Sequence, residues 1–185
     1  SVFTGIRPLV KSGDAKNTAA LSRGHTIEID GAGLLTITGG KWTTYRSMAE
    51  DAVNQALKLG GLEERKPGTE SLRIHGFSDE SSAYGSDVEI IEEIIREEPG
   101  LGEKLHPDLP YTAAEIVFAV RYEMAQTLED ALARRTRALF LNARAAIEMA
   151  PVVARIMAEE LGKDEEWAAS EVEVFSNLAD GYLCQ

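Results

Sequence analysis

The sequence predicts a mainly α-helical protein of the α+β class, with a helical carboxy-terminal domain after a short strand–turn–helix region. Three observations predict this. Residues 78–185 repeat apolar side chains at helical spacing almost throughout. Residues 1–40 instead alternate short apolar runs with Gly, Asp and Asn, which is typical of strands and turns. Between these regions, residues 62–77 have no clear period and are broken by Pro67-Gly68, which indicates a linker.

The composition excludes several classes of protein. With 185 residues and 44% hydrophobic content, the chain can form one ordinary domain, or a small domain and a piece of another. No apolar stretch reaches the roughly 18 residues that span a membrane, and no secretion signal is recognisable. Cys184 is the single cysteine, so a disulfide within the monomer and a zinc–thiolate cluster are excluded. We expect a cytoplasmic protein with no metal and no transmembrane segment.

Charge is distributed unevenly along the chain. Residues 1–78 carry 10 Lys and Arg against 8 Asp and Glu, whereas residues 79–185 carry 9 against 23. The net charge of −12 would repel nucleic acid, so no nucleic-acid partner is expected. Arg134, Arg135 and Arg137 form a basic patch inside the acidic part, and we expect them to pair with neighbouring acids. An anion site is expected in the amino-terminal part instead.

The amino-terminal elements follow from apolar runs and glycines. Strands are predicted at residues 2–6, 26–29 and 34–38, and residues 30–33 supply a hairpin-like turn between the last two. After Gly39-Gly40 the apolar side chains fall at helical spacing until Gly60-Gly61, which predicts a helix that stops there.

The helical part is divided by caps and breakers. An acidic surface helix is expected from about residue 88 until Pro99-Gly100. The predicted amino-terminal caps of later helices are Thr112 with Glu115, Thr127 with Asp130, Asn142, and Asp164. Pro151 lies within an apolar helical pattern, so it should kink that helix or start a new one.

The most informative unit for chemistry is the strand–glycine–helix run from residue 34 to residue 46. A helix that starts after two glycines presents unpaired backbone N–H groups, and Lys41 adds a positive charge at the same place. Arg7 and Arg23 lie beside other predicted strands, so three cations could converge on a phosphate. The alternative interpretation is an ordinary strand-to-helix turn with solvated surface charges. The histidines have no metal-ligand spacing, and His75 and His106 are expected to be exposed.

Three short runs and two long helical ones resemble one known family. Residues 6–9 (IRPL), 22–25 (SRGH) and 39–46 (GGKWTTYR) are similar to bacterial FAD-dependent glycerol-3-phosphate dehydrogenases and the related alpha-glycerophosphate oxidases. Residues 124–143 (MAQTLEDALARRTRALFLNA) and 150–162 (APVVARIMAEELG) resemble the helical carboxy-terminal domain of that family. The resemblance covers nearly the whole chain.

The resemblance implies an oxidoreductase that converts sn-glycerol 3-phosphate to dihydroxyacetone phosphate, with hydride passing to FAD and electrons to a quinone, or to oxygen in the oxidases. It places Lys41 and Arg23 as catalytic residues, and Arg7, Arg23 and Lys41 at the substrate phosphate. The implied contacts with the flavin come from Gly39, Gly40, Lys41, Trp42 and Thr43. The implied location of the parent enzyme is peripheral, at the inner face of the cell membrane.

The glycine fingerprint that cradles the flavin pyrophosphate in this family does not occur in these residues. We therefore expect a fragment that binds FAD negligibly and is inactive alone. Residues 1–61 would finish the FAD- and substrate-binding domain, residues 62–77 would be a linker, and residues 78–185 a helical domain. We also expect residues 1–40 to be disordered or to associate between chains. The second hypothesis is a non-catalytic helical module for interaction or homodimerisation.

Overall fold

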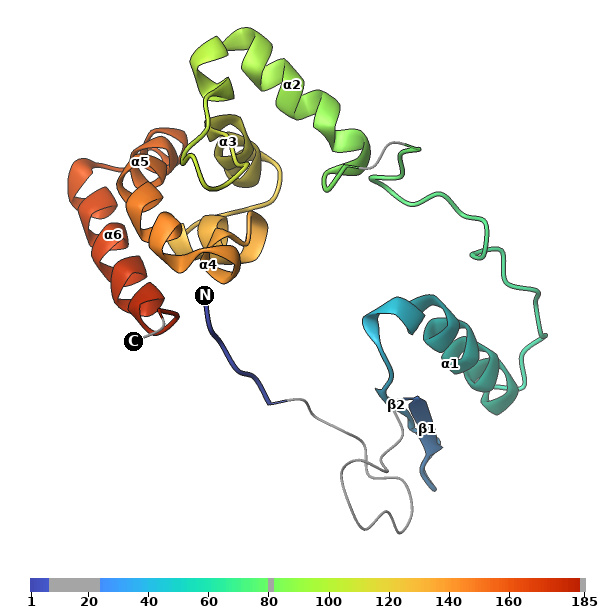
Figure 1. Ribbon diagram of the computed structural model, residues 1–185. Helices are drawn as coiled ribbons and strands as arrows, with labels where there is room; N and C mark the ends of the chain where they lie inside the picture. Colours follow the sequence, from blue (N-terminus) through green and yellow to red (C-terminus); the bar gives the residue numbers. More distant parts are fainter. Residues whose placement is uncertain (7–23, 80–81, 184–185) are drawn as a thin grey trace. The chain divides into compact units, whose positions relative to one another are not determined.

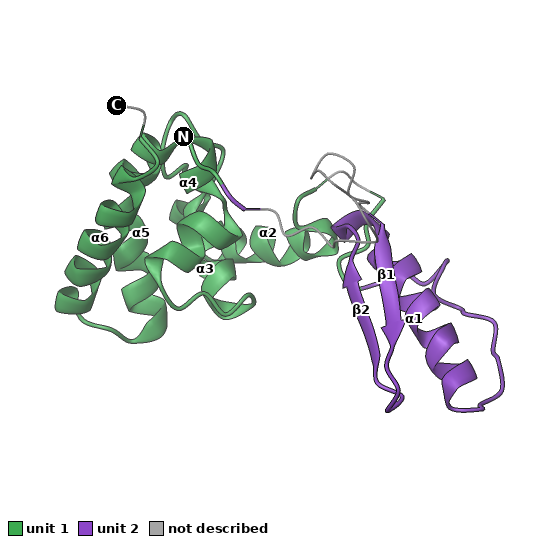
Figure 2. Ribbon diagram, turned by 90° about the horizontal axis from the view of Figure 1, so that it is seen from below, with its two compact units in different colours: residues 1–4, 75–185 green, residues 5–74 purple. Residues whose placement is uncertain are grey.

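The computed structural model describes residues 1–6, 24–79 and 82–183. Two compact units divide the chain: residues 5–74 form the hairpin–helix unit, and residues 1–4 with 75–185 form the helical unit (Figure 2). Within the described residues, no helix combines the length and the apolar character needed to cross a bilayer. The predicted three-part domain scheme, with boundaries at 61/62 and 77/78, stays a prediction.

The hairpin–helix unit begins with two antiparallel strands, β1 (His25–Ile29) and β2 (Leu35–Gly39). One carboxylate oxygen of Asp30 accepts the backbone N–H groups of Ala32 and Leu34, at 2.8 and 2.9 Å, and so closes the turn between the strands. The strands predicted at 26–29 and 34–38 are confirmed, together with the turn between them.

A helical segment follows the hairpin. A single 3-10 turn (Trp42–Thr44) leads into α1 (Tyr45–Leu59), which ends at Gly60. The predicted helix and its glycine stop are therefore confirmed. Residues 62–74 then continue without a helix or a strand. Residues 25–39 form a hairpin in the structure, and the expectation that residues 1–40 are disordered or associate between chains stays a prediction.

The helical unit contains five α-helices among its described residues (Figure 1). They are α2 (Val88–Glu97), α3 (Ala113–Arg121), α4 (Ala138–Leu141), α5 (Ala143–Leu161) and α6 (Glu165–Asp180). Two 3-10 turns, Gly85–Asp87 and Pro99–Gly102, flank α2, and a π-helical stretch, Asp130–Arg135, precedes α4. The predicted fold class, mainly helical with a small strand region, is confirmed.

Helix α5 supplies the largest share of the core. Its buried face is built of small and flexible side chains: Ala143, Ala145, Ala146, Met149, Ala150, Val153, Ala154, Met157 and Ala158. From α6, Phe175 is 1% exposed and packs into the same cluster. A second, smaller cluster joins Ile91 and Ile94 of α2 to Val117 and Phe118 of α3. Every buried hydrophobic residue of the described chain belongs to the helical unit.

The predicted caps are found where the sequence placed them. Thr112 and Glu115 form the capping box of α3. The side chain of Asn142 accepts the N–H of Ala145 at 3.2 Å, and that of Asp164 accepts the N–H of Trp167 at 2.9 Å. Thr127 and Asp130 also form the reciprocal bonds of a capping box. The hydroxyl of Thr127 accepts the N–H of Asp130, and the Asp130 carboxylate accepts the N–H of Thr127, both at 3.1 Å.

Of the two alternatives predicted for Pro151, a new helix is wrong, because α5 runs without a break from Ala143 to Leu161, and a kink stays a prediction. The proline ring is exposed, so the one backbone donor that proline removes is lost on the solvent side of the helix. Residues 2–6, predicted as a strand, form none.

The first four residues instead lie against the helical unit. The Ser1 hydroxyl accepts the N–H of Ala143, at the start of α5, at 2.7 Å. The N–H of Val2 donates to the carbonyl of Tyr182 at 2.9 Å, and the Phe3 ring centroid is 6.3 Å from that of Tyr182. The helical unit is therefore discontinuous in sequence, because two segments separated by the whole hairpin–helix unit build it.

Two of the three arginines of the basic patch pair with neighbouring acids, as predicted. Arg134 bonds Asp130 at 2.9 Å and also contacts Glu129. Arg135 donates to the backbone carbonyl of Glu123 at 3.0 Å and lies 3.9 Å from its carboxylate. The guanidinium of Arg137 lies over the ring of Phe140, 5.5 Å from its centroid, which is a cation–π contact.

The packing of α6 gives the first testable prediction. Phe175→Ala should lower the free energy of unfolding by about 3–5 kcal/mol, because it removes a fully buried ring from the main core. Its neighbour Val174 is 61% exposed, so Val174→Ala should change stability by less than about 0.5 kcal/mol. Urea unfolding followed by far-ultraviolet circular dichroism measures both; equal losses would show that α6 is packed differently.

Candidate functional site

The run of residues 39–46 crosses from the hairpin into α1. Gly39 is the last residue of β2, Trp42 to Thr44 form the 3-10 turn, and Tyr45 begins α1. Lys41, Trp42 and Thr43 are all exposed, and Trp42 is 88% exposed with its ring centroid 5.9 Å from that of Tyr45. The run is thus an accessible strand-to-helix junction, as the sequence predicted.

The two glycines are required by the backbone conformation. Gly39 has φ +78° and Gly40 has φ +81°, a region in which a side chain is strained. The N–H of Gly40 donates to the carbonyl of Gly24 at 3.1 Å, which ties the junction to the start of the hairpin. A Cβ at Gly40 would lie 2.3 Å from the sulfur of Met48, so α1 also packs directly on this residue.

Lys41 occupies the capping position before the 3-10 turn. Its N–H donates to the hydroxyl of Thr44 at 3.2 Å, and its carbonyl accepts the N–H of Thr44 at 3.0 Å. These bonds use only the backbone of Lys41. Its ammonium group takes part in no ion pair with any residue that the structure describes. A free cation therefore lies at the start of a helix, where the first N–H groups also favour anions.

Arg7 and Arg23 lie outside the described residues. Their convergence with Lys41 on a phosphate is neither supported nor contradicted, and it stays a prediction. Of the predicted site residues, the structure brings together Gly39, Gly40, Lys41, Trp42 and Thr43 as one continuous junction.

Sequence reasoning missed a polar contact beside this junction. Nε2 of His25, the first residue of β1, lies 2.8 Å from a carboxylate oxygen of Asp51 on α1. The hydrogen bond from His25, followed by one from Gln55, holds the pKa of Asp51 below its ordinary value. The two residues are 26 positions apart in sequence, and no motif links them. A single sequence therefore offers no signal that would have paired them.

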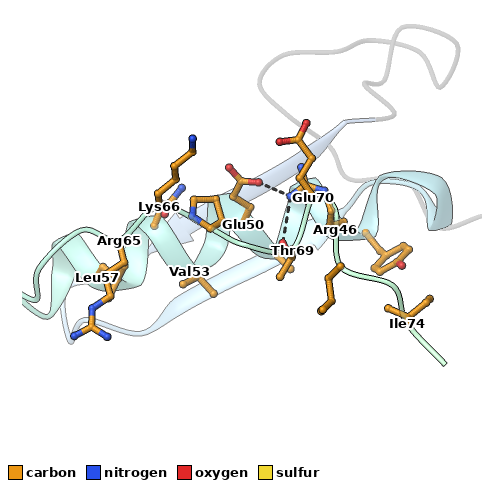
Figure 3. A pocket seen from close by; sticks show the side chains of 14 residues that line it. Arg46, Glu50, Val53, Leu57, Arg65, Lys66, Thr69, Glu70 and Ile74 are labelled. Atoms are coloured by element: carbon orange, nitrogen blue, oxygen red, sulfur yellow. Dashed lines mark hydrogen bonds and ion pairs between the residues drawn. The ribbon is translucent and has the colours of Figure 1, made fainter. Parts of the chain in front are cut away.

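A groove runs along a different face of α1 from the one that carries Met48 and Asp51. It has a volume of about 680 Å³ and lies between α1 and the extended residues 65–74 (Figure 3). Arg46, at the end of the junction, donates to Glu50 at 2.5 Å and to the hydroxyl of Thr69 at 3.4 Å, which ties the extended segment to the helix. Apolar side chains such as Val53 and Leu72 line the groove, and both are more than half exposed.

The remaining histidines are engaged with single carboxylates. His75 lies 2.9 Å from Asp87, and its side chain is 85% exposed, as predicted. His106 lies 3.0 Å from Glu148, but its side chain is only 14% exposed, so the prediction of an exposed histidine is wrong there. Among the described residues, no group of three or more His, Cys, Asp or Glu is arranged to hold a metal ion.

Comparison with known proteins points to one family. A family model described as the C-terminal domain of alpha-glycerophosphate oxidase matches residues 25–168. The chain is 38% identical to a protein of Caenorhabditis elegans named "Probable glycerol-3-phosphate dehydrogenase, mitochondrial", with 92% of this chain and 27% of that protein covered. It is 36% identical to the mitochondrial glycerol-3-phosphate dehydrogenase of Rattus norvegicus and 34% identical to that of Bos taurus, with 94% of this chain and 27% of each protein covered.

The glycine junction gives the second prediction. Gly40→Ala should loosen the bond from Gly40 to Gly24, because the new methyl group meets Met48 and the left-handed backbone costs about 1–2 kcal/mol. Gly33→Ala is the matched control, with φ +86° but nothing within 4 Å of its Cβ. Amide hydrogen exchange at residue 40 should accelerate more in Gly40→Ala than in Gly33→Ala.

A second substitution separates the two causes. Adding Met48→Ala to Gly40→Ala should remove the part of the effect that comes from the collision and leave the part that comes from φ. Equal exchange in the single variants Gly40→Ala and Gly33→Ala would contradict the contact between Met48 and the glycine junction.

Proposed function

The chain belongs to the family of C-terminal domains of alpha-glycerophosphate oxidase, and we propose that it is part of an FAD-dependent enzyme that oxidises sn-glycerol 3-phosphate to dihydroxyacetone phosphate. The match over residues 25–168 carries this proposal. The relatives are named glycerol-3-phosphate dehydrogenases, which favours an oxidoreductase over a non-catalytic interaction module. These relatives come from eukaryotes, so the family extends beyond the bacterial enzymes that the sequence resembles.

The proposed activity belongs to a longer polypeptide. The chain spans about a quarter of the length of the curated relatives it matches, 27% of the first of them. No described side chain of the hairpin–helix unit is buried, so the glycine junction has open surface for further protein or a cofactor. We expect the 185-residue chain alone to bind flavin negligibly and to have no dehydrogenase activity.

The chemistry of the junction fits one edge of a flavin. Two glycines without side chains allow a planar ring to approach the backbone, and helical N–H groups with a free ammonium favour negative charge. Gly39, Gly40, Trp42 and Thr43 would hold FAD mainly through backbone groups. When bound, FAD supplies the acceptor for the hydride that leaves the substrate carbon.

Lys41 has two roles in the proposal. Its ammonium would attract the substrate phosphate, assisted by Arg7 and Arg23, and would stabilise negative charge on the neighbouring flavin ring. Two hydrogen bonds to Thr44 fix the backbone of Lys41, so its side chain extends from a defined position.

The remaining partners follow from the same proposal. A quinone would take the electrons at a membrane surface, to which the longer enzyme would be bound peripherally. A homodimer is also compatible with the accessible surface of the hairpin–helix unit. Oxygen is the alternative acceptor, as in the oxidase for which the family is named.

The third prediction tests Lys41 in the longer enzyme that contains this chain. Lys41→Ala should lower kcat/KM for glycerol 3-phosphate by roughly a hundredfold or more, since it removes a charge aimed at the reacting groups. Lys58→Ala is the matched control, because Lys58 is an exposed lysine of the same unit, in the last turn of α1 and 3.6 Å from Glu64. Full activity of Lys41→Ala would remove Lys41 from the site.

The fourth prediction concerns the chain by itself. After purification, its absorbance spectrum should lack the near-ultraviolet and visible bands of flavin. Added FAD should not bind stoichiometrically. A yellow protein with one flavin per chain would contradict the expectation that the junction forms only one edge of the cofactor site.

A further inference from the structure

We infer that His25 is a positioning residue for Lys41: its bond to Asp51 holds the hairpin on α1 and thereby sets the glycine junction that precedes Lys41. The inference rests on the proposed function for the role of Lys41, and on the geometry of the hairpin–helix unit for the role of His25. His25 contacts neither substrate nor flavin in this proposal.

The hairpin couples His25 directly to the glycine junction. In the β1–β2 ladder, His25 is paired with Gly39, so the two residues lie opposite one another at the open end of the hairpin. Immediately beyond this pair, Gly40 donates its N–H to the carbonyl of Gly24 at 3.1 Å. A movement of His25 therefore moves both glycines that lead into Lys41.

Helix α1 holds the same end of the hairpin at two points. Met48 lies against Gly40, where a Cβ would come within 2.3 Å of its sulfur. Asp51, three residues further and on the same face of the helix, bonds His25 at 2.8 Å. The second carboxylate oxygen of Asp51 accepts a longer bond of 3.4 Å from Gln55, which helps to orient the carboxylate.

These contacts matter because no core supports them. None of the described residues of the hairpin–helix unit is buried. The side chain of His25 is 24% exposed and that of Asp51 is 46% exposed, so the histidine is among the better covered side chains of the unit. In a unit without a core, one directed hydrogen bond between a strand and a helix restricts their relative orientation more than scattered apolar contacts do.

The expected effect of losing His25 is a displaced Lys41, not a missing one. In the longer enzyme, His25→Ala should lower kcat/KM for glycerol 3-phosphate by about tenfold, since misplacement of a binding group by about 1 Å can cost up to a hundredfold. His25→Gln retains a side-chain N–H that can donate to Asp51, and it should restore part of this loss.

A double-mutant cycle tests whether His25 acts through Lys41. The longer enzyme is measured as His25→Ala, as Lys41→Ala and as the double variant. If His25 only positions Lys41, the double variant loses no more kcat/KM than Lys41→Ala alone. Losses that multiply would show that His25 acts independently and would overturn the inference.

A structural measurement on the 185-residue chain is independent of activity. His25→Ala and Asp51→Ala should each accelerate amide hydrogen exchange at Gly40, whose N–H bonds Gly24. His75→Ala is the matched control, because it removes a similar pair, His75 with Asp87 at 2.9 Å, from the helical unit. It should leave exchange at Gly40 unchanged.

The two measurements separate the inference from the proposed function. Unchanged exchange at Gly40 in both His25→Ala and Asp51→Ala would overturn the positioning role, whatever the enzyme's activity. A longer enzyme that does not oxidise glycerol 3-phosphate, or whose activity is untouched by Lys41→Ala, would overturn the proposed function, and the exchange result would still decide whether His25 holds the junction.

Discussion

Burial of the alanine-rich face of α5 is the interaction on which the helical unit depends. Six of the nine buried residues of this helix are alanines, and such small side chains let neighbouring helices approach closely. Phe175 of α6 is buried in the same cluster as these alanines. Burial of apolar surface contributes about 25 cal/mol per Å², so this face stabilises the helical unit in a way that no element of the hairpin–helix unit can match.

The hairpin–helix unit is held by different forces. Its order comes from the β1–β2 ladder, the Asp30 turn, the glycine junction and single polar contacts such as that of Arg46 with Glu50. Such contacts fix local geometry but contribute little free energy when exposed to solvent. The hairpin–helix unit therefore has a defined local geometry but little stability of its own. This suits a segment whose proposed role is to form one wall of a larger pocket.

Sequence patterns predicted the features that are local. The hairpin turn, the helix stop at Gly60 and the caps at Thr112, Asn142 and Asp164 were predicted because each depends on residues a few positions apart. Residues 2–6 were misassigned, since a short apolar run fits a strand, whereas in the structure Val2 and Phe3 contact Tyr182. The choice between a kinked helix and a new helix at Pro151 could not be made from the sequence, because it depends on which side of the helix faces solvent.

The candidate site also combines features that the local sequence predicts with a contact that it does not predict. The junction at Gly39 and Gly40 follows from glycine and helical spacing, and its exposed Lys41 from the charge at that place. The bond of His25 to Asp51 depends on how the hairpin folds back on α1, and two residues 26 positions apart carry no joint signal in a single sequence. The predicted contribution of Arg7 and Arg23 depends on residues that the structure does not describe.

The segment formed by the first four residues has a consequence for the order of biosynthesis. Val2 and Phe3 contact Tyr182, which the ribosome adds roughly 10 to 40 s later at 5–20 residues per second. During that interval their binding surface on the helical unit does not yet exist. Residues 1–4 therefore cannot dock until α6 and Tyr182 have been made, while the hairpin and α1 can already form.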